Sequence, residues 1–69
     1  MKFLFGDKVK VDGGFYKGVI GIVTDYKHVP LIEYFYDEYY IEGTFPMYGN
    51  RLKFVSTWIN EKELEKLEE

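Results

Sequence analysis

The chain contains no cysteine, which excludes disulfide bonds and thiolate metal sites as sources of its stability. Histidine occurs once, at His28, which is too few for a zinc site of the usual composition. No apolar run approaches the roughly 20 residues that cross a bilayer, and the apolar start of the chain ends at Gly6. We therefore expect no targeting segment and no membrane association, and the lack of cysteine favours a cytoplasmic location.

Side chains suited to catalysis are equally scarce. Apart from His28, the chain has one serine, Ser56, and three threonines. Their positions show no spacing typical of a nucleophile, a base and an orienting group. The sequence therefore predicts a protein that is not an enzyme and that carries neither a metal nor another cofactor.

Aromatic residues are plentiful. They make up 20% of the 69 residues, within a hydrophobic fraction of 46%. A chain of this length forms one domain near the lower size limit for an independent core. Large rings can fill such a core with few residues. We therefore expect a single domain over residues 1–69 that is stabilised by packing alone.

Short β-prone segments separated by turn residues run along the chain. They cover residues 9–11, 19–23, 31–42 and 52–55. We expect a break at residues 28–30, a bulge or turn where alternation slips at Asp37 and Glu38, and a loop over residues 43–50. Close spacing of short strands indicates an all-β fold, a small barrel of four to five strands.

The end of the chain allows two interpretations. Asn60 and Glu63 have the spacing of a capping box, with asparagine in place of serine or threonine. Either a short 3-10 turn leads into a final strand at residues 64–67, or a helix runs to the C-terminus. Leu64 and Leu67 would suit a helix face as well as a strand, so the pattern leaves both open.

From Val9 the sequence reads VKVDGGFYKGVIGIV, which resembles the KOW motif over residues 6–26. The matching positions are Val9, Val11, Gly14, Lys17, Gly18, Gly21 and Val23. The resemblance implies an SH3-like barrel whose loop at Lys17 contacts RNA or proteins of ribosomal and transcription complexes. Residues 54–65 are similar to the ending of other SH3-like barrels, including the small photosystem I stromal subunit, which favours the final strand.

The same positions also have a purely physical interpretation. The three valines should face one core, and Gly14 and Gly18 should bracket a loop with unusual dihedral angles. Gly21 should let its strand bend around a neighbour. Lys17 is the exception, because a long charged side chain in a loop has no role in closing the fold.

An acidic and aromatic run over residues 33–42 is the most unusual part of the composition. Alternation should direct half of its rings outward, and exposed tyrosine is common in protein interfaces. We therefore predict a binding module that docks to a protein in a nucleic-acid-handling assembly. The predicted contact residues are Phe15, Tyr16, Lys17, Tyr34, Tyr36, Tyr39 and Tyr40.

Three alternatives stay open. The first is direct RNA or DNA binding through Lys8, Lys10, Lys17, Lys27, Arg51 and Lys53. The net charge of −3 opposes it, although residues 1–32 carry five lysines against three aspartates. The second is an acidic mimic of nucleic acid, of phage origin, that inhibits a DNA-binding protein. The third is an aromatic cage for a methylated lysine or arginine.

Overall fold

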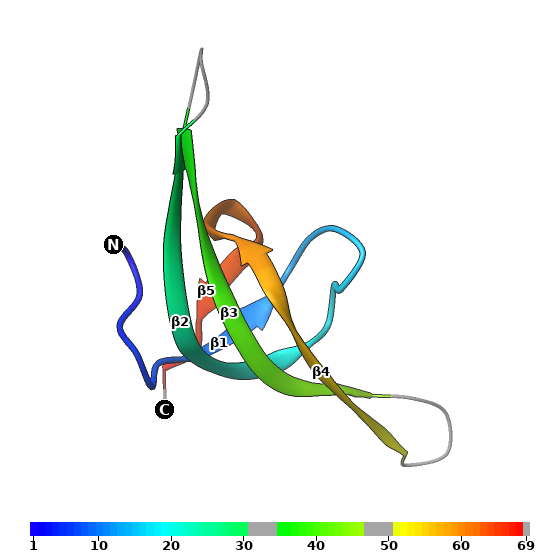
Figure 1. Cartoon of the computed structure of the whole chain (residues 1–69). Helices are drawn as coiled ribbons and strands as arrows, with labels where there is room; N and C mark the ends of the chain where they lie inside the picture. Colours follow the sequence, from blue (N-terminus) through cyan, green and yellow to red (C-terminus); the bar gives the residue numbers. More distant parts are fainter. Residues whose placement is uncertain (31–34, 47–50, 69) are drawn as a thin grey trace.

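The computed structural model describes residues 1–30, 35–46 and 51–68 (Figure 1). It contains one antiparallel sheet with the strand order β4-β3-β2-β1-β5. The elements are β1 (Lys8–Val11), β2 (Ile20–Pro30), β3 (Phe35–Pro46), β4 (Leu52–Asn60), the 3-10 turn η2 (Glu61–Glu63) and β5 (Leu64–Lys66). The predicted all-β class, the number of strands and the short turn near the C-terminus are therefore confirmed.

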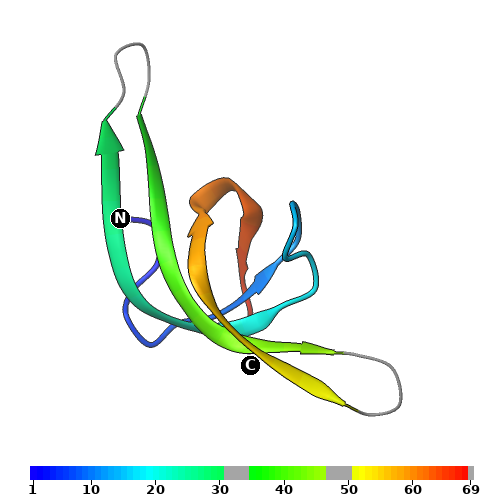
Figure 2. The same cartoon turned by 45° about the vertical axis from the view of Figure 1, so that its right-hand side comes forward.

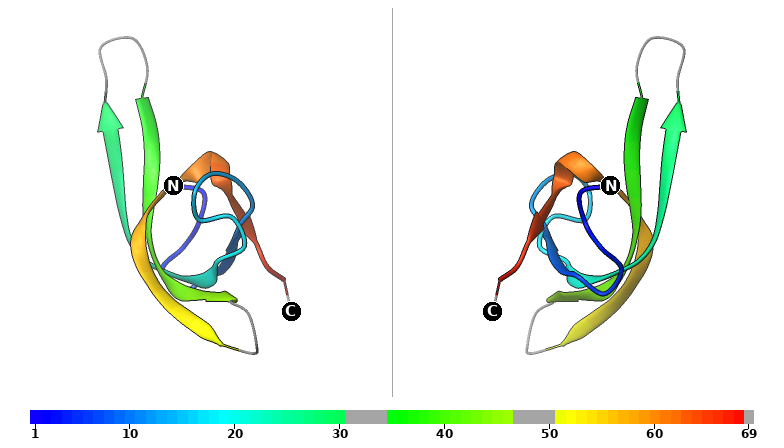
Figure 3. Two further views of the ribbon diagram at one scale, coloured as in Figure 1. Left: turned by 90° about the vertical axis from the view of Figure 1, so that its right-hand side faces the viewer. Right: turned by 90° about the vertical axis from the view of Figure 1, so that its left-hand side faces the viewer.

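The sheet is strongly curled, so that β5 lies across from β4 with η2 joining them at one end (Figures 2 and 3). Within the described residues, the hydrogen-bonded ladder begins at β4 and ends at β5 without closing between these two edges. Closure into a complete barrel is therefore not confirmed.

Two paired glycines allow β2 and β3 to bend together. Gly21 lies directly opposite Gly43 in the register. A Cβ atom on Gly21 would lie 2.6 Å from the carbonyl oxygen of Glu42 and 2.8 Å from the Cα of Gly43. No other residue fits at that approach, so this pair lets the sheet curl, as expected for Gly21.

β2 and β3 form a long arm that projects beyond the rest of the sheet (Figure 1). Their pairing continues to Pro30 and Phe35, whereas the pairing of β4 with β3 ends at Glu38. The predicted break at residues 28–30 is therefore wrong. The predicted loop over residues 43–50 is partly wrong, because β3 continues to Pro46, and residues 47–50 lie outside the described part.

β3 also runs through Asp37 and Glu38 without a bulge, and the irregularity of register lies on β2, between Val23 and Asp25. The prediction failed because Asp37 keeps the alternation. It faces the same side as Tyr39, but beyond the core, where Tyr26 donates a hydrogen bond to its carboxylate. A charged side chain can therefore occupy that position without a change of register.

The core lies on the inner side of the curl. It is formed by Phe3, Val9, Val11, Val19, Val23, Tyr39, Ile41, Ile59 and Leu64. The three valines of the sequence motif are among these residues, as expected. Phe3 precedes the first strand, yet its side chain is only 2% exposed and packs edge-on against the Tyr39 ring with a centroid distance of 5.1 Å. The N-terminal segment is thus part of the core.

The final element is a strand and not a helix. The Asn60 side chain accepts a hydrogen bond of 2.9 Å from the backbone of Lys62 and caps η2. Leu64 then enters the core and pairs with Val11 of β1. Pairing with the free edge of β1 satisfies backbone groups that a lone, weakly apolar helix would have left open. Where the chain is described, no helix is long and apolar enough to span a bilayer.

Candidate functional site

An apolar cleft of about 220 Å³ lies beside the loop between β1 and β2. Two aromatic residues of the loop meet the inward-facing residues at one end of β3 and β4. The lining residues are Phe15, Tyr16, Phe45, Lys53 and Val55. Four of the five side chains are aromatic or aliphatic, and one carries a positive charge.

The loop owes its shape to two glycines with positive φ, Gly14 at 77° and Gly18 at 103°. These angles favour glycine over residues with a Cβ. The backbone nitrogen of Gly18 donates to the Val11 carbonyl over 2.8 Å, which closes the loop at its base. The expected glycine-flanked loop is therefore present, and it holds the residues between its glycines at the rim of the cleft.

The two loop rings lie in different environments. Tyr16 is half-buried and packs against the core, whereas Phe15 is 91% exposed. The rings meet edge-to-face, with centroids 5.0 Å apart and planes at 80°. An aromatic ring so exposed gains little from folding, so its place beside an apolar cleft makes it the strongest candidate contact residue.

The predicted lysine face is divided between separate surfaces. Lys53 lines the cleft, and Lys8 lines a hollow on the outer face of the sheet. Lys27 lies on the arm, where its Nζ is 3.3 Å from the Glu38 carboxylate and 4.5 Å from the centre of the Trp58 ring. Three of the predicted basic residues are exposed but line neither the cleft nor the outer hollow: Lys10, Lys17 and Arg51. Of the six predicted basic residues, Lys53 alone therefore lines the cleft together with the two loop rings.

The predicted tyrosine face is also divided. Tyr39 is fully buried in the core and does not lie on the surface where a partner could contact it. Tyr40 is half-buried on the opposite face, edge-on to Trp58 with a centroid distance of 5.3 Å. Tyr36 is half-buried near η2, and Tyr34 lies outside the described residues. Alternation along β3 separates neighbouring tyrosines, which explains the division.

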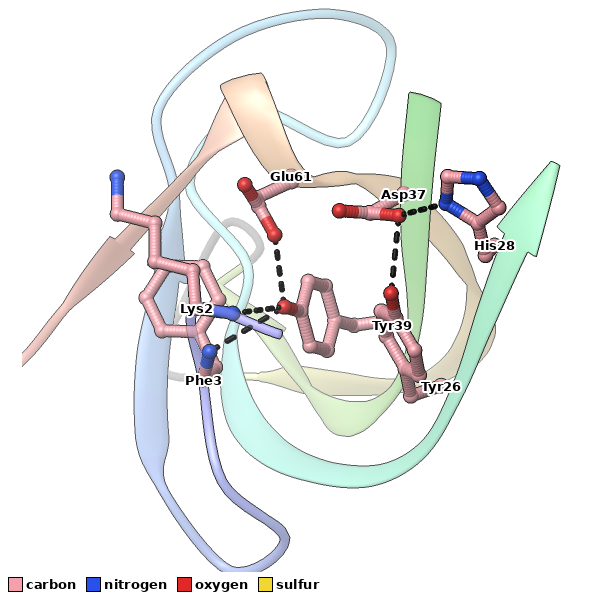
Figure 4. Close-up of polar contacts among 7 residues, drawn as sticks. All are labelled: Lys2, Phe3, Tyr26, His28, Asp37, Tyr39 and Glu61. Carbon is pink, nitrogen blue, oxygen red and sulfur yellow. Dashed lines mark hydrogen bonds and ion pairs between the residues drawn. The ribbon is translucent and has the colours of Figure 1, made fainter. Parts of the chain in front are cut away.

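Tyr39 forms a polar network that the sequence did not reveal (Figure 4). Its hydroxyl donates to Glu61 over 2.7 Å and accepts hydrogen bonds from the backbone nitrogens of Lys2, at 2.7 Å, and Phe3, at 3.2 Å. Burial and the Glu61 hydrogen bond raise the pKa of Tyr39 above its ordinary value. The network joins the N-terminal segment, β3 and η2, which is a structural role.

A second polar network lies on the arm (Figure 4). Tyr26 donates a hydrogen bond of 3.0 Å to the Asp37 carboxylate, and Nδ1 of His28 lies 2.7 Å from the same oxygen. The hydrogen bond with His28 is the main reason why the pKa of Asp37 is lowered, and the one with Asp37 raises the pKa of Tyr26. The break predicted at residues 28–30 would have placed His28 in a loop. His28 is instead a strand residue that pairs with Asp37.

The second network does not bring a serine to the His28–Asp37 pair. The only serine, Ser56, lines the outer hollow, whereas the side chains of His28 and Asp37 lie on the face that carries Tyr39. Asp37 and Glu61 both line a small polar hollow of about 150 Å³ beside η2, and each carboxylate already accepts hydrogen bonds from the chain. Within the described residues, no group of three or more His, Cys, Asp or Glu side chains could hold a metal ion.

Comparison with protein families, curated proteins and solved structures finds no match to this chain. The functional argument therefore rests on the geometry of the cleft and on the residues around it.

Proposed function

We propose that this chain is a non-catalytic binding module that docks to a protein partner through the cleft beside its glycine-flanked loop. The observation that supports this most strongly is Phe15, which is 91% exposed at the rim of an apolar cleft. Tyrosine and phenylalanine at such a rim can close over an inserted side chain and exclude water from it.

The size of the cleft limits what it accepts. Its volume of about 220 Å³ is below the range of roughly 300–1,000 Å³ that is usual for cofactors and drug-sized ligands. A cleft of this size suits one large apolar side chain of a partner segment. Lys53 also lines the cleft, and its positive charge favours a partner carboxylate next to the inserted side chain. The proposed ligand is thus a peptide segment with an apolar anchor beside an acidic residue.

The SH3-like barrel of KOW type, and a partner within a nucleic-acid-handling assembly, are parts of the same proposal. The position of β1 between β2 and β5, and the positive φ angles of Gly14 and Gly18, support the barrel type. Support for the assembly comes only from the resemblance of residues 6–26 to the KOW motif.

A displayed library of random peptides tests the proposal. The library is selected against the wild-type protein, Phe15→Ala and Phe54→Ala. Phe54 is the matched control, because its ring is 85% exposed on the outer face of the sheet, away from the cleft. We expect the wild-type protein and Phe54→Ala to enrich the same peptides, each with an apolar residue beside Asp or Glu. We expect Phe15→Ala to bind those peptides at least about tenfold more weakly.

Equal binding of the enriched peptides to all three proteins, or no enrichment on the wild-type protein, would contradict the proposal. Lys53→Glu adds a second criterion. It should weaken binding of the acidic peptides and leave melting unchanged, because the Lys53 side chain is exposed.

Direct nucleic-acid binding is a second candidate, because a cation and two rings meet in one cleft. Its test is an NMR titration with short single-stranded RNA and duplex DNA at low and moderate salt. Salt-sensitive shifts at Phe15, Tyr16 and Lys53 would replace the peptide proposal with this one. An absence of shifts in both salts would remove it.

A further inference from the structure

The outer face of the sheet carries exposed apolar side chains around a broad hollow. Ile22 is 47% exposed and Phe54 is 85% exposed, and Ile20, in the same row of the register as Phe54, lies on the same face. The hollow, of about 760 Å³, is bordered by these residues and by the short side chains of Thr44 and Ser56. Scattered exposed apolar residues are ordinary, but a group on one face of a sheet indicates an interaction surface.

Two opposite charges flank the centre of this face. In the register, Lys8 of β1 and Glu42 of β3 are the neighbours of Ile22 on its two sides. Two strand spacings, about 10 Å, separate their backbones. Neither side chain forms an ion pair with another described residue. A lysine and a glutamate placed symmetrically about an isoleucine form a pattern that is complementary to itself.

We propose that this face binds a second copy of the chain, with the two-fold axis parallel to β2 and passing beside Ile22. Rotation about this axis turns one sheet to face the other and exchanges the β1 side with the β3 side. Lys8 of each copy then lies opposite Glu42 of the other, and the two Ile22 side chains meet at the centre. An axis across the strands would instead place Lys8 opposite Lys8, so the charges select the first arrangement.

The same rotation accounts for the hollow. Lys10 and Thr44 flank Ile20 as Lys8 and Glu42 flank Ile22. Lys10 of the second copy therefore comes to lie above Thr44, next to Phe54. Its aliphatic stem can cover the hollow, and its ammonium group can approach the exposed Phe54 ring. Long side chains of one copy thus meet short ones of the other, as a packed interface requires.

Sedimentation velocity of the whole chain, from about 10 µM to about 1 mM, tests the proposal over the range of weak association. We expect the wild-type protein to change from monomer to dimer within this range. Lys8→Glu and Glu42→Lys should each weaken association at least about tenfold, because each places two pairs of like charges in contact. The double variant Lys8→Glu with Glu42→Lys should restore association, because it exchanges the charges without removing the pairs.

Two control variants carry the same changes of charge at other places. They are Lys17→Glu, in the loop between β1 and β2, and Glu68→Lys, after the end of β5. Both wild-type side chains are exposed. Both should associate like the wild-type protein. A monomer at every concentration, or a dimer in which Lys8→Glu and Lys17→Glu behave alike, would overturn the proposal. Failure of the double variant to recover association while it melts like the wild-type protein would also overturn it. The proposal does not depend on the cleft, so either one can fail alone.

Discussion

The phenol oxygen of Tyr39 lies 2.7 Å from the Glu61 carboxylate, inside a sheet whose other buried side chains, where the chain is described, are apolar. The same oxygen accepts hydrogen bonds from two backbone nitrogens of the N-terminal segment. One hydroxyl therefore connects three segments that are distant in sequence. It satisfies polar groups that would otherwise be buried without partners.

The change Tyr39→Phe tests this network. It keeps the ring in the core but removes the hydroxyl, so two backbone donors and Glu61 lose their partner. We expect the free energy of unfolding to fall by about 1–3 kcal/mol. Urea denaturation measures the change. Tyr40→Phe is the control, because Tyr40 is only half-buried and its ring packs on Trp58. Equal losses in the two variants would contradict the prediction.

Replacing Gly43 by alanine tests the bend between β2 and β3. A Cβ on Gly43 would lie 2.6 Å from the Cα of Gly21, where only backbone movement could make room. We expect a loss of about 2 kcal/mol or more in the free energy of unfolding. Gly13→Ala is the matched control, because its Cβ would meet only the Cγ of Glu63, at 3.7 Å. Thermal melting should therefore separate the two variants clearly.

Replacement by alanine should lower the free energy of unfolding strongly at Phe3 and hardly at all at Phe15. The side chain of Phe3 is 2% exposed, so Phe3→Ala should cost about 3–5 kcal/mol. A chain of this length has only about 3–10 kcal/mol of stability in total, so this variant will be largely unfolded or will melt far earlier. Phe15→Ala should change the melting temperature little. If circular dichroism melts show that Phe15→Ala loses as much as Phe3→Ala, Phe15 belongs to the core, contrary to its exposure.

The pairing of Asp37 with His28 predicts a contribution to acid sensitivity. The pKa of Asp37 is lowered from its ordinary value of 3.8, chiefly by the hydrogen bond with His28. The unfolded chain therefore takes up a proton at higher pH than the folded chain does. The stabilisation is present above the unfolded pKa and is lost as the pH falls through the folded pKa.

We expect Asp37→Asn to lose less stability than the wild-type protein when the pH falls from about 5 to about 2.5. Urea denaturation at several pH values measures the two slopes. Asp25→Asn serves as the control, since within the described residues the carboxylate of Asp25 accepts only a local hydrogen bond, from the backbone of Tyr26. Parallel slopes for the wild-type protein and Asp37→Asn would show that the pairing contributes nothing.

Local patterns predicted part of the fold correctly. The buried positions of Val9, Val11 and Val23 follow from alternation, and the dihedral angles of Gly14 and Gly18 follow from the turn that they bracket. Asn60 caps its turn through a contact within two residues. Such features depend on neighbours in sequence, so sequence alone contains them. The extent of β2 past His28 does not, because it depends on pairing with β3.

By itself, the sequence determined the all-β class, the glycine-flanked loop with its two aromatic rings, and the three buried valines. Only the tertiary structure decided which tyrosines lie on the surface, where a partner could contact them. It buried Tyr39, placed Tyr40 against Trp58, and brought Lys53 to the loop while leaving Lys8 beside Ile22 on another face. The reason is physical. The register between strands decides which distant side chains become neighbours, and a shift of one residue would exchange the two faces.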